Sequence, residues 1–135
     1  MDFSHINWLA TVVAALSSFL VGGLWYSKIL FGSAWMTASN LTLDQVKTGN
    51  KGKIFGFTFL FSLIMAINIA IYLSDPTGTN IEFGSKVGFH AGLIAFSAIG
   101  IAGLFELKSW KYIFINGGYS LVSLTLMGLI IGAWK

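Results

Sequence analysis

Residues 54–73 read IFGFTFLFSLIMAINIAIYL, a run without a single charged side chain. A bilayer core about 30 Å thick is crossed by about 20 apolar residues in a helix, so this run predicts a membrane span. Three more uncharged runs of similar length follow the same pattern, at residues 6–26, 87–105 and 112–134. We therefore expect one all-α domain over residues 1–135, a polytopic four-helix transmembrane bundle. Its spans are predicted at about 6–27, 54–73, 86–106 and 112–134.

The composition excludes several classes of protein. Apolar residues make up 56% of the chain and charged residues 10%, which leaves too little polar surface for a soluble protein. The chain has no cysteine, and this excludes disulfide exchange, thiolate catalysis and iron–sulfur clusters. All eight basic residues are dispersed lysines, so we expect no nucleic-acid binding. No Ser-His-acid trio lies at one depth and no glycine-rich phosphate loop occurs, so we expect no catalytic residue, metal, cofactor or enzymatic activity.

The lysines predict the orientation of the chain in the membrane. Six of them lie in the connections after the first and third spans: Lys28, Lys47, Lys51, Lys53, Lys108 and Lys111. Short lysine-rich connections stay in the cytoplasm, so we expect a bacterial inner membrane protein with both termini and the connection 74–86 outside. Asp2 stands where a signal peptide would carry basic residues, so the first span is expected to stay in the mature protein.

The connection between the first two spans combines two local patterns. Residues 31–36 (FGSAWM) mix aromatic and small side chains, which is typical of a segment lying at the lipid headgroups. Residues 42–45 (TLDQ) fit a capping box, in which the Thr hydroxyl and the Gln amide each accept from a backbone N–H. We therefore expect an interfacial segment followed by a short helix.

The polar residues of the first, second and fourth spans each fall on one helical face, and at the inner end two such faces meet, whereas the third span has two faces that are not typical of lipid contact. Residues 25–27 (WYS) close the first span at a depth similar to Asn116 and Tyr119, which begin the fourth. The candidate polar cluster comprises Trp25, Tyr26, Ser27, Glu106, Asn116, Tyr119 and Ser120. Two interpretations stay open, because such a cluster is either interhelical hydrogen bonding or the mouth of a cavity. Glu106 ends a helix, where a carboxylate needs a nearby cation, so it is either a rim ion pair or a gate.

The third span contains an ionisable residue and a stripe of small residues. His90 is the only histidine within a span, and an ionisable residue there is a functional candidate. Asn68 of the second span is its expected neighbour, and the two form a candidate outer-side site, with a purely structural hydrogen bond as the alternative. The expected helix-packing positions are Gly88, Gly92, Gly128 and Gly132. Small residues let helices approach closely, so these positions favour a homo-oligomer or packing within the chain.

Several motifs together resemble one known family. Residues 7–10 (NWLA), 23–27 (GLWYS) and 31–36 (FGSAWM), with residues 114–119 (FINGGY) near the end, are similar to small bacterial and fungal membrane proteins catalogued as a domain of unknown function. The resemblance covers the whole chain and implies four spans and an integral membrane location. It implies no activity, ligand or partner. The third span departs from the family, which usually has a Gly-Phe pair and bulky aromatics where this chain has residues 90–94 (HAGLI).

Two functional hypotheses follow from these patterns. The first is a small homo-oligomeric bundle that handles an ion or a small polar solute along its polar faces. The alternative is a non-catalytic membrane scaffold or partner-binding protein that associates through its third span. Membrane lipid and a second copy of the chain are the expected partners in either case.

Overall fold

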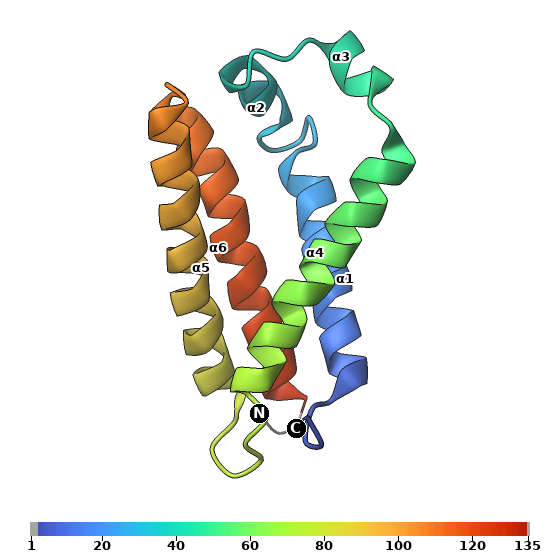
Figure 1. The fold of residues 1–135 in the computed structure, drawn as a ribbon, viewed down its shortest axis with the longest axis vertical. Coiled ribbons are helices and arrows are strands. Elements are labelled where there is room, and N and C mark those ends of the chain that lie inside the picture. The colour runs from blue at the N-terminus through green and yellow to red at the C-terminus, as the bar shows by residue number, and fades with distance from the viewer. Residues whose placement is uncertain (1–2, 135) are drawn as a thin grey trace.

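The computed structural model describes residues 3–134, which form helices joined by short connections (Figure 1). Over this range the helices are α1 (Trp8–Trp25), α2 (Gly32–Ala38), α3 (Leu43–Thr48), α4 (Lys51–Tyr72), α5 (Ile81–Phe105) and α6 (Trp110–Ala133). Four of them, α1, α4, α5 and α6, are long and apolar enough to cross a membrane. The predicted all-α class with four candidate spans is therefore confirmed.

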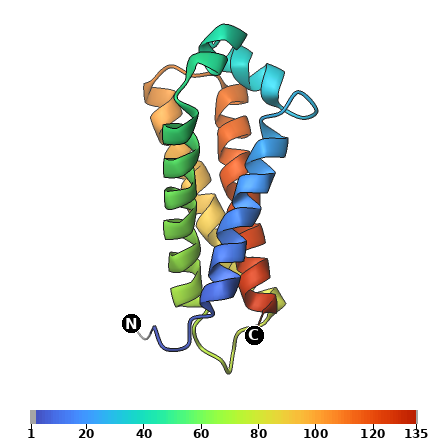
Figure 2. The same cartoon turned by 90° about the vertical axis from the view of Figure 1, so that its right-hand side faces the viewer.

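The four long helices run alternately up and down (Figures 1 and 2). As a result α1 begins and α6 ends at the same end of the bundle, where the connection between α4 and α5 also lies. The short helices α2 and α3 lie at the opposite end. We call these the terminal end and the α2–α3 end.

Each long helix begins at a polar residue whose side-chain oxygen accepts a hydrogen bond from a free backbone N–H of the first turn. These N-caps are Asn7, Asn50, Asn80 and Ser109. Asn80 starts α5 at Ile81, five residues before the predicted span, and Lys86 Nζ donates to Glu82 Oε1 at 2.6 Å across this extra turn. The prediction that residues 74–86 form one connection is therefore wrong in its second half, because a capped helix extends beyond its apolar part.

The connection between α1 and α4 contains both of its expected patterns. Residues of the predicted interfacial segment form most of α2, which packs against α6. The capping box is confirmed: Gln45 N donates to Thr42 Oγ1 at 3.2 Å, and Thr42 N donates to Gln45 Oε1 at 2.8 Å. A short helix therefore forms at α3 without burying any residue.

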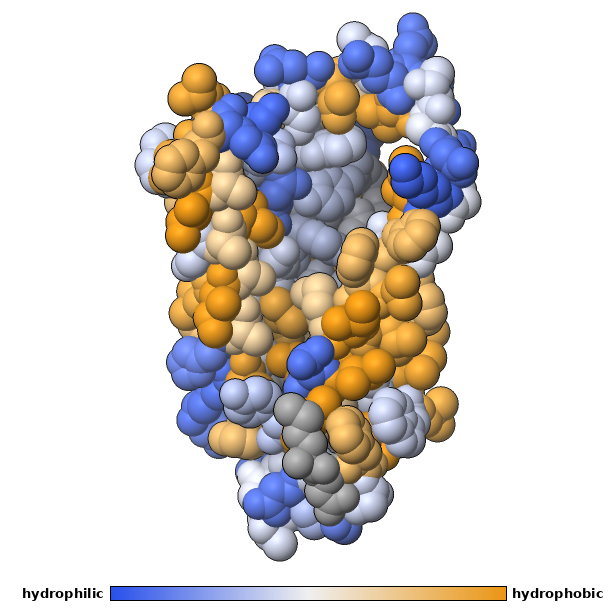
Figure 3. Space-filling view, viewed as in Figure 1, coloured by the Kyte–Doolittle hydropathy of each residue, from blue (hydrophilic) through white to orange (hydrophobic). Residues whose placement is uncertain are grey.

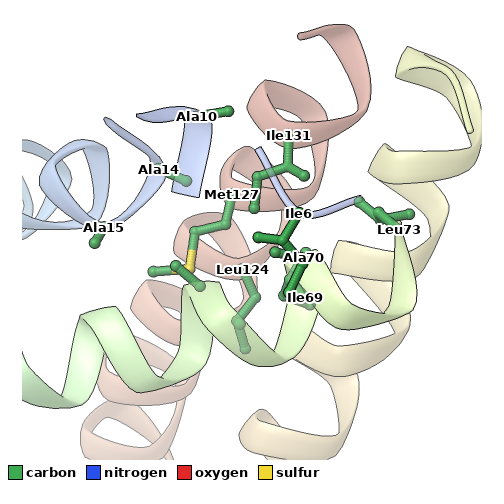
Figure 4. Packing of buried hydrophobic residues seen from close by; sticks show 11 residues of the cluster. Ile6, Ala10, Ala14, Ala15, Ile69, Ala70, Leu73, Leu124, Met127 and Ile131 are labelled. Carbon is green, nitrogen blue, oxygen red and sulfur yellow. The ribbon is translucent and has the colours of Figure 1, made fainter. Parts of the chain in front are cut away.

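The hydrophobic core lies between α1, α4 and α6 in the half of the bundle nearest the terminal end (Figure 4). Its side chains are small on α1 and larger on α6, where Met127 and Ile131 fill the space beside the alanines. The core residues are Ile6, Ala10, Ala14, Ala15, Ala66, Ile69, Ala70, Leu73, Leu124, Met127 and Ile131. α4 is thus held against α1 and α6 mainly in this half.

The pair α5 and α6 is the most extensive helix contact, and glycines make it close. A Cβ atom added at Gly88 would overlap the Leu124 carbonyl, and one at Gly92 would lie 2.8 Å from Leu121 Cα. A Cβ at Gly132 would lie 3.0 Å from Gly84 Cα, and Gly128 faces the same residue. The glycines predicted for helix packing therefore lie between α5 and α6 of one chain.

Away from the core, α4 diverges from α5 towards the α2–α3 end (Figure 1). The two helices make only sparse contact with each other. Figure 3 shows the molecule hollowed at this place, with a paler, less apolar floor than the hydrophobic band below it. We call this hollow, between α4 and the α5–α6 pair, the groove.

Candidate functional site

Polar contacts join α1 to α6 at both ends of the pair. At the terminal end Asn7 Nδ2 donates to the Trp134 carbonyl at 3.1 Å. At the α2–α3 end Trp25 Nε1 donates to the Ile115 carbonyl at 2.9 Å. Lipid offers no partner to such groups, so the polar faces of the two helices satisfy each other.

Near the Trp25 contact, hydroxyl and amide groups form two further sets of hydrogen bonds. Tyr26 Oη donates to Asn116 Oδ1 at 2.7 Å, and Asn116 Nδ2 donates to the Tyr112 carbonyl at 3.0 Å. Tyr119 Oη donates to the Ser18 carbonyl at 3.0 Å and lies 3.1 Å from Ser18 Oγ. Because the tyrosine has one hydroxyl proton, the Ser18 hydroxyl is the donor in that second bond. Ser18 is thereby satisfied, although it is almost completely buried.

Aromatic rings hold these groups together across three helices. The ring centroids of Tyr26 and Tyr119 are 5.4 Å apart, and those of Tyr26 and Trp35 are 5.2 Å apart, both edge to face. Such pairs contribute about 0.5–1.5 kcal/mol beyond their buried area. We define the aromatic cluster as Trp25, Tyr26, Trp35, Asn116 and Tyr119.

Two glycines leave the space that these rings occupy. A Cβ atom added at Gly22 would lie 3.1 Å from Tyr119 Oη, and one at Gly118 would lie 3.1 Å from Trp25 Cζ2. Each glycine lies opposite an aromatic ring of the facing helix. The cluster therefore depends on a small residue of one helix lying at the same level as a large residue of the other.

The structure brings only part of the predicted polar cluster together. Trp25, Tyr26, Asn116 and Tyr119 meet as described. Ser27 donates instead to its own helix, to the Leu24 carbonyl at 2.6 Å.

Glu106 also lies outside the cluster, as the exposed C-cap of α5. Within residues 3–134 it makes no ion pair, so the expected neighbouring cation is not found.

Two contributors to the site were not among the predicted site residues. Ser18 lies two helical turns before Trp25 on the same face of α1, and this spacing is the signal that identifies it. Trp35 comes from α2. The sequence does not show which face of a helix will contact its neighbours when that helix follows an irregular connection. The contact of Trp35 with Tyr26 could not be predicted from spacing.

Three hydroxyls near the middle of the bundle have no hydrogen-bond partner among residues 3–134. Ser62 of α4 and Ser123 of α6 are buried, and Ser123 Oγ is fully enclosed without a partner. Ser120 is half-buried and makes no hydrogen bond either. By contrast, Ser97 and Thr125 donate to carbonyls four residues earlier in their own helices, at 2.8 and 2.7 Å. A buried hydroxyl without a hydrogen bond is unfavourable in an apolar region.

Asn116, Ser120 and Ser123 follow one face of α6 that continues to Met127. Met127 packs in the core against α4. Because α4 diverges from the bundle beyond the core, the part of this face nearer the α2–α3 end borders the groove. The aromatic cluster and Ser120 are therefore followed along α6 by the enclosed Ser123, in the direction from the groove to the core.

The predicted outer-side pair is not joined in the structure. Asn68 Nδ2 donates to the Ile64 carbonyl of its own helix at 2.8 Å, and both Asn68 and His90 are exposed. The His90 ring contacts that of Phe89, with the centroids 6.1 Å apart. No hydrogen bond links His90 to any residue in the range 3–134.

Within residues 3–134, no three histidine, aspartate or glutamate side chains are close enough together to hold a metal ion.

A shallow surface depression of about 510 Å³ lies at the α2–α3 end. Its lining residues are Thr37, Ala38, Asn40, Leu107, Lys108, Ser109 and Lys111.

Comparison with known proteins gives one match. A family model described as a protein of unknown function (DUF1761) matches residues 9–132. No curated protein and no solved structure matches the chain.

Proposed function

Because the chain belongs to the family of proteins of unknown function DUF1761, whose description names no activity, we propose a function from the residues of this chain. We propose that it is an integral membrane protein that handles an ion or a small polar solute at the groove. It acts as a homo-oligomer and without catalysis. The aromatic cluster and Ser120 are the proposed contact for the solute at the groove, and the enclosed Ser123 lies beyond them towards the core.

The three unpartnered hydroxyls carry this proposal. Most serine and threonine hydroxyls of the spans bond to their own helix, whereas those of Ser62, Ser120 and Ser123 do not. An unpaired buried hydroxyl costs about 1–3 kcal/mol, which a hydrogen bond to water or to a polar solute removes. Away from the helix ends, residues 54–72, 87–105 and 112–133 of these helices contain no charged residue, so the solute is neutral or is an ion held by oxygen atoms.

The groove supplies an entrance to these hydroxyls. It lies in the half of the molecule nearer the α2–α3 end, where most of the lysines gather. Lysine-rich connections favour the cytoplasmic side, so we propose access from the cytoplasm and both termini outside a bacterial plasma membrane. The proposed binding of a solute does not depend on this orientation, because the groove would bind the solute whichever side of the membrane it faces.

A scaffold that binds a membrane partner is the alternative function. The close glycine contact between α5 and α6 and the paired polar faces of α1 and α6 favour a rigid, dry bundle. The two functions differ in one measurable property, which is water access to the middle of the bundle.

Single cysteines in this cysteine-free chain test that property. Cysteine replaces Ser120, Ser62 or Ser123 in turn, and each variant is treated in membrane vesicles with a membrane-impermeant thiol reagent. We expect Ser120→Cys to react fastest, and the two buried positions to react more slowly. Ser97→Cys is the matched control, because Ser97 lies at mid-span but is exposed outside the bundle. Labelling of Ser120→Cys no faster than Ser97→Cys would overturn the proposal and favour the scaffold.

A further inference from the structure

The surface depression at the α2–α3 end lies where two candidate spans leave the membrane. Its lining comes from the end of α2, from the connection between α5 and α6, and from the first turn of α6. The uncharged run of the third span ends at Phe105, and that of the fourth begins at Tyr112. The residues between them therefore lie at the level of the lipid headgroups.

Two cations line this depression, and none of its described lining residues is an acid. Lys108 and Lys111 belong to the lining, which contains neither aspartate nor glutamate. Neither lysine forms an ion pair within residues 3–134. Glu106 is close in sequence, but it is exposed as the C-cap of α5 and does not line the depression. The depression therefore carries a positive charge that no carboxylate of its lining compensates.

Lys108 differs from the other lysines of the described chain. It is half-buried, whereas every other lysine within residues 3–134 is exposed. Its Nζ lies 5.4 Å from the centroid of the Tyr112 ring, a contact that keeps the ammonium group beside the start of α6. A cation that has lost part of its water and has no carboxylate partner is stabilised by an anionic ligand.

Neutral side chains of the depression add hydrogen-bond donors. Ser109 Oγ accepts from Tyr112 N at 3.2 Å, so its hydroxyl proton is left to donate. The Asn40 side chain makes no hydrogen bond within residues 3–134, and its amide has two N–H donors. Phosphate oxygens accept from all of these groups and bind strongly to cations. The volume of about 510 Å³ is within the range of about 300–1,000 Å³ found for small-molecule sites.

Apolar side chains beside the depression favour a lipid over a soluble anion. Phe105, Leu107 and Trp110 are 86%, 92% and 64% exposed, and they flank Lys108 in the sequence. We propose that the depression binds the phosphate group of an anionic membrane lipid. Lys108 and Lys111 pair with the phosphate, and the exposed apolar side chains contact the acyl chains. Basic pockets at the ends of spans are typical binding sites of anionic headgroups. This site depends neither on the groove nor on its solute.

Native mass spectrometry of the full chain in detergent micelles measures this binding. The probes are phosphatidylglycerol, which is anionic, and phosphatidylcholine, which has a phosphate but no net charge. We expect one molecule of phosphatidylglycerol to bind more tightly than phosphatidylcholine. One lysine near an anionic headgroup raises affinity about 5-fold, so Lys108→Gln combined with Lys111→Gln should weaken binding about 30-fold. Arginine at both positions keeps the charge and should retain the binding.

Lys47→Gln combined with Lys51→Gln is the matched control. Both lysines are exposed at the same end of the molecule without lining the depression, and the loss of net charge is the same. Equal weakening by the two pairs of substitutions would overturn the site and indicate diffuse attraction. Thr37→Phe keeps Lys108 and Lys111 but fills the depression, so it should also weaken binding. Unchanged affinity of the Thr37→Phe chain would overturn the depression as the place of binding.

Glycerol phosphate, which has the phosphate but no acyl chain, distinguishes a lipid from a soluble ligand. We expect an excess of glycerol phosphate to leave phosphatidylglycerol bound. Displacement of the lipid would overturn the assignment and indicate a site for a soluble phosphate compound. Because the thiol labelling of Ser120→Cys is measured separately, failure of the lipid site and failure of the solute-binding groove are distinguishable.

Discussion

Replacement of Gly88 by alanine should separate the two helices that contact each other most closely. A Cβ atom at this position would overlap the Leu124 carbonyl and lie 2.9 Å from Thr125 Cα. Both obstacles are backbone atoms of α6, which cannot rotate away as a side chain can. The α5–α6 distance therefore has to increase at the level of Gly88.

The cost follows from the packing that is lost. Inserting one methyl group into a well-packed interface typically costs about 1–3 kcal/mol. Alanine recovers part of this, because glycine in a helix is about 1 kcal/mol less favourable than alanine. We therefore expect a net loss of up to about 2 kcal/mol, which lowers the folding equilibrium constant by up to about 30-fold.

Denaturation by SDS in mixed micelles, followed by tryptophan fluorescence, measures this difference. Gly56→Ala and Gly23→Ala are matched controls, because a Cβ atom at either position meets nothing within 4 Å. These variants should be as stable as the parent chain or slightly more stable. A Gly88→Ala protein as stable as Gly56→Ala would refute the close α5–α6 packing.

Further measurements address the aromatic cluster and the connection between α4 and α5. Tyr119→Phe removes the hydroxyl that bonds Ser18 and should cost about 0.6–2 kcal/mol in the same assay, whereas Tyr72→Phe, at a side chain that is 78% exposed, should cost almost nothing. The Thr77 hydroxyl and N–H donate to Asp75 and hold the pKa of that carboxyl below its usual range, so Thr77→Val should raise the pKa in an NMR titration. Because the native pKa is lowered, this contribution to stability is present at neutral pH and is lost as the pH falls through that pKa.

The presence of four candidate spans could be predicted because it depends on local properties. Uncharged length predicts a span, and N-cap residues such as Asn50 and Ser109 begin α4 and α6 through contacts within one turn. The capping box of α3 is local in the same sense. The start of α5 was missed because its first turn is polar, and hydropathy detects only the part of a helix that lies in lipid.

The residues of the aromatic cluster could be predicted only where they lie on a polar helix face that has to contact another helix. Trp25 and Asn116 lie on polar faces that must point to protein, and their helices pack together. Ser27 and Glu106 lie at similar depths, but a residue that ends a helix can turn towards solvent. The sequence predicts how deep a residue of a span lies in the membrane. The direction in which a side chain points at the end of a helix depends instead on the connection that follows.

The glycine positions show why small residues alone do not reveal a homo-oligomer. The G-x-x-x-G of residues 88–92 packs against residues 121–125 of α6, and that of residues 128–132 packs against residues 80–88, so both motifs are used between α5 and α6 of one chain. Once both lie within one chain, they cannot also join two chains. Association of two copies then has to use another exposed surface of the helices. Gly92→Leu should therefore disrupt folding of the monomer before it affects assembly, because a side chain at this position would overlap the Leu121 backbone of the same chain.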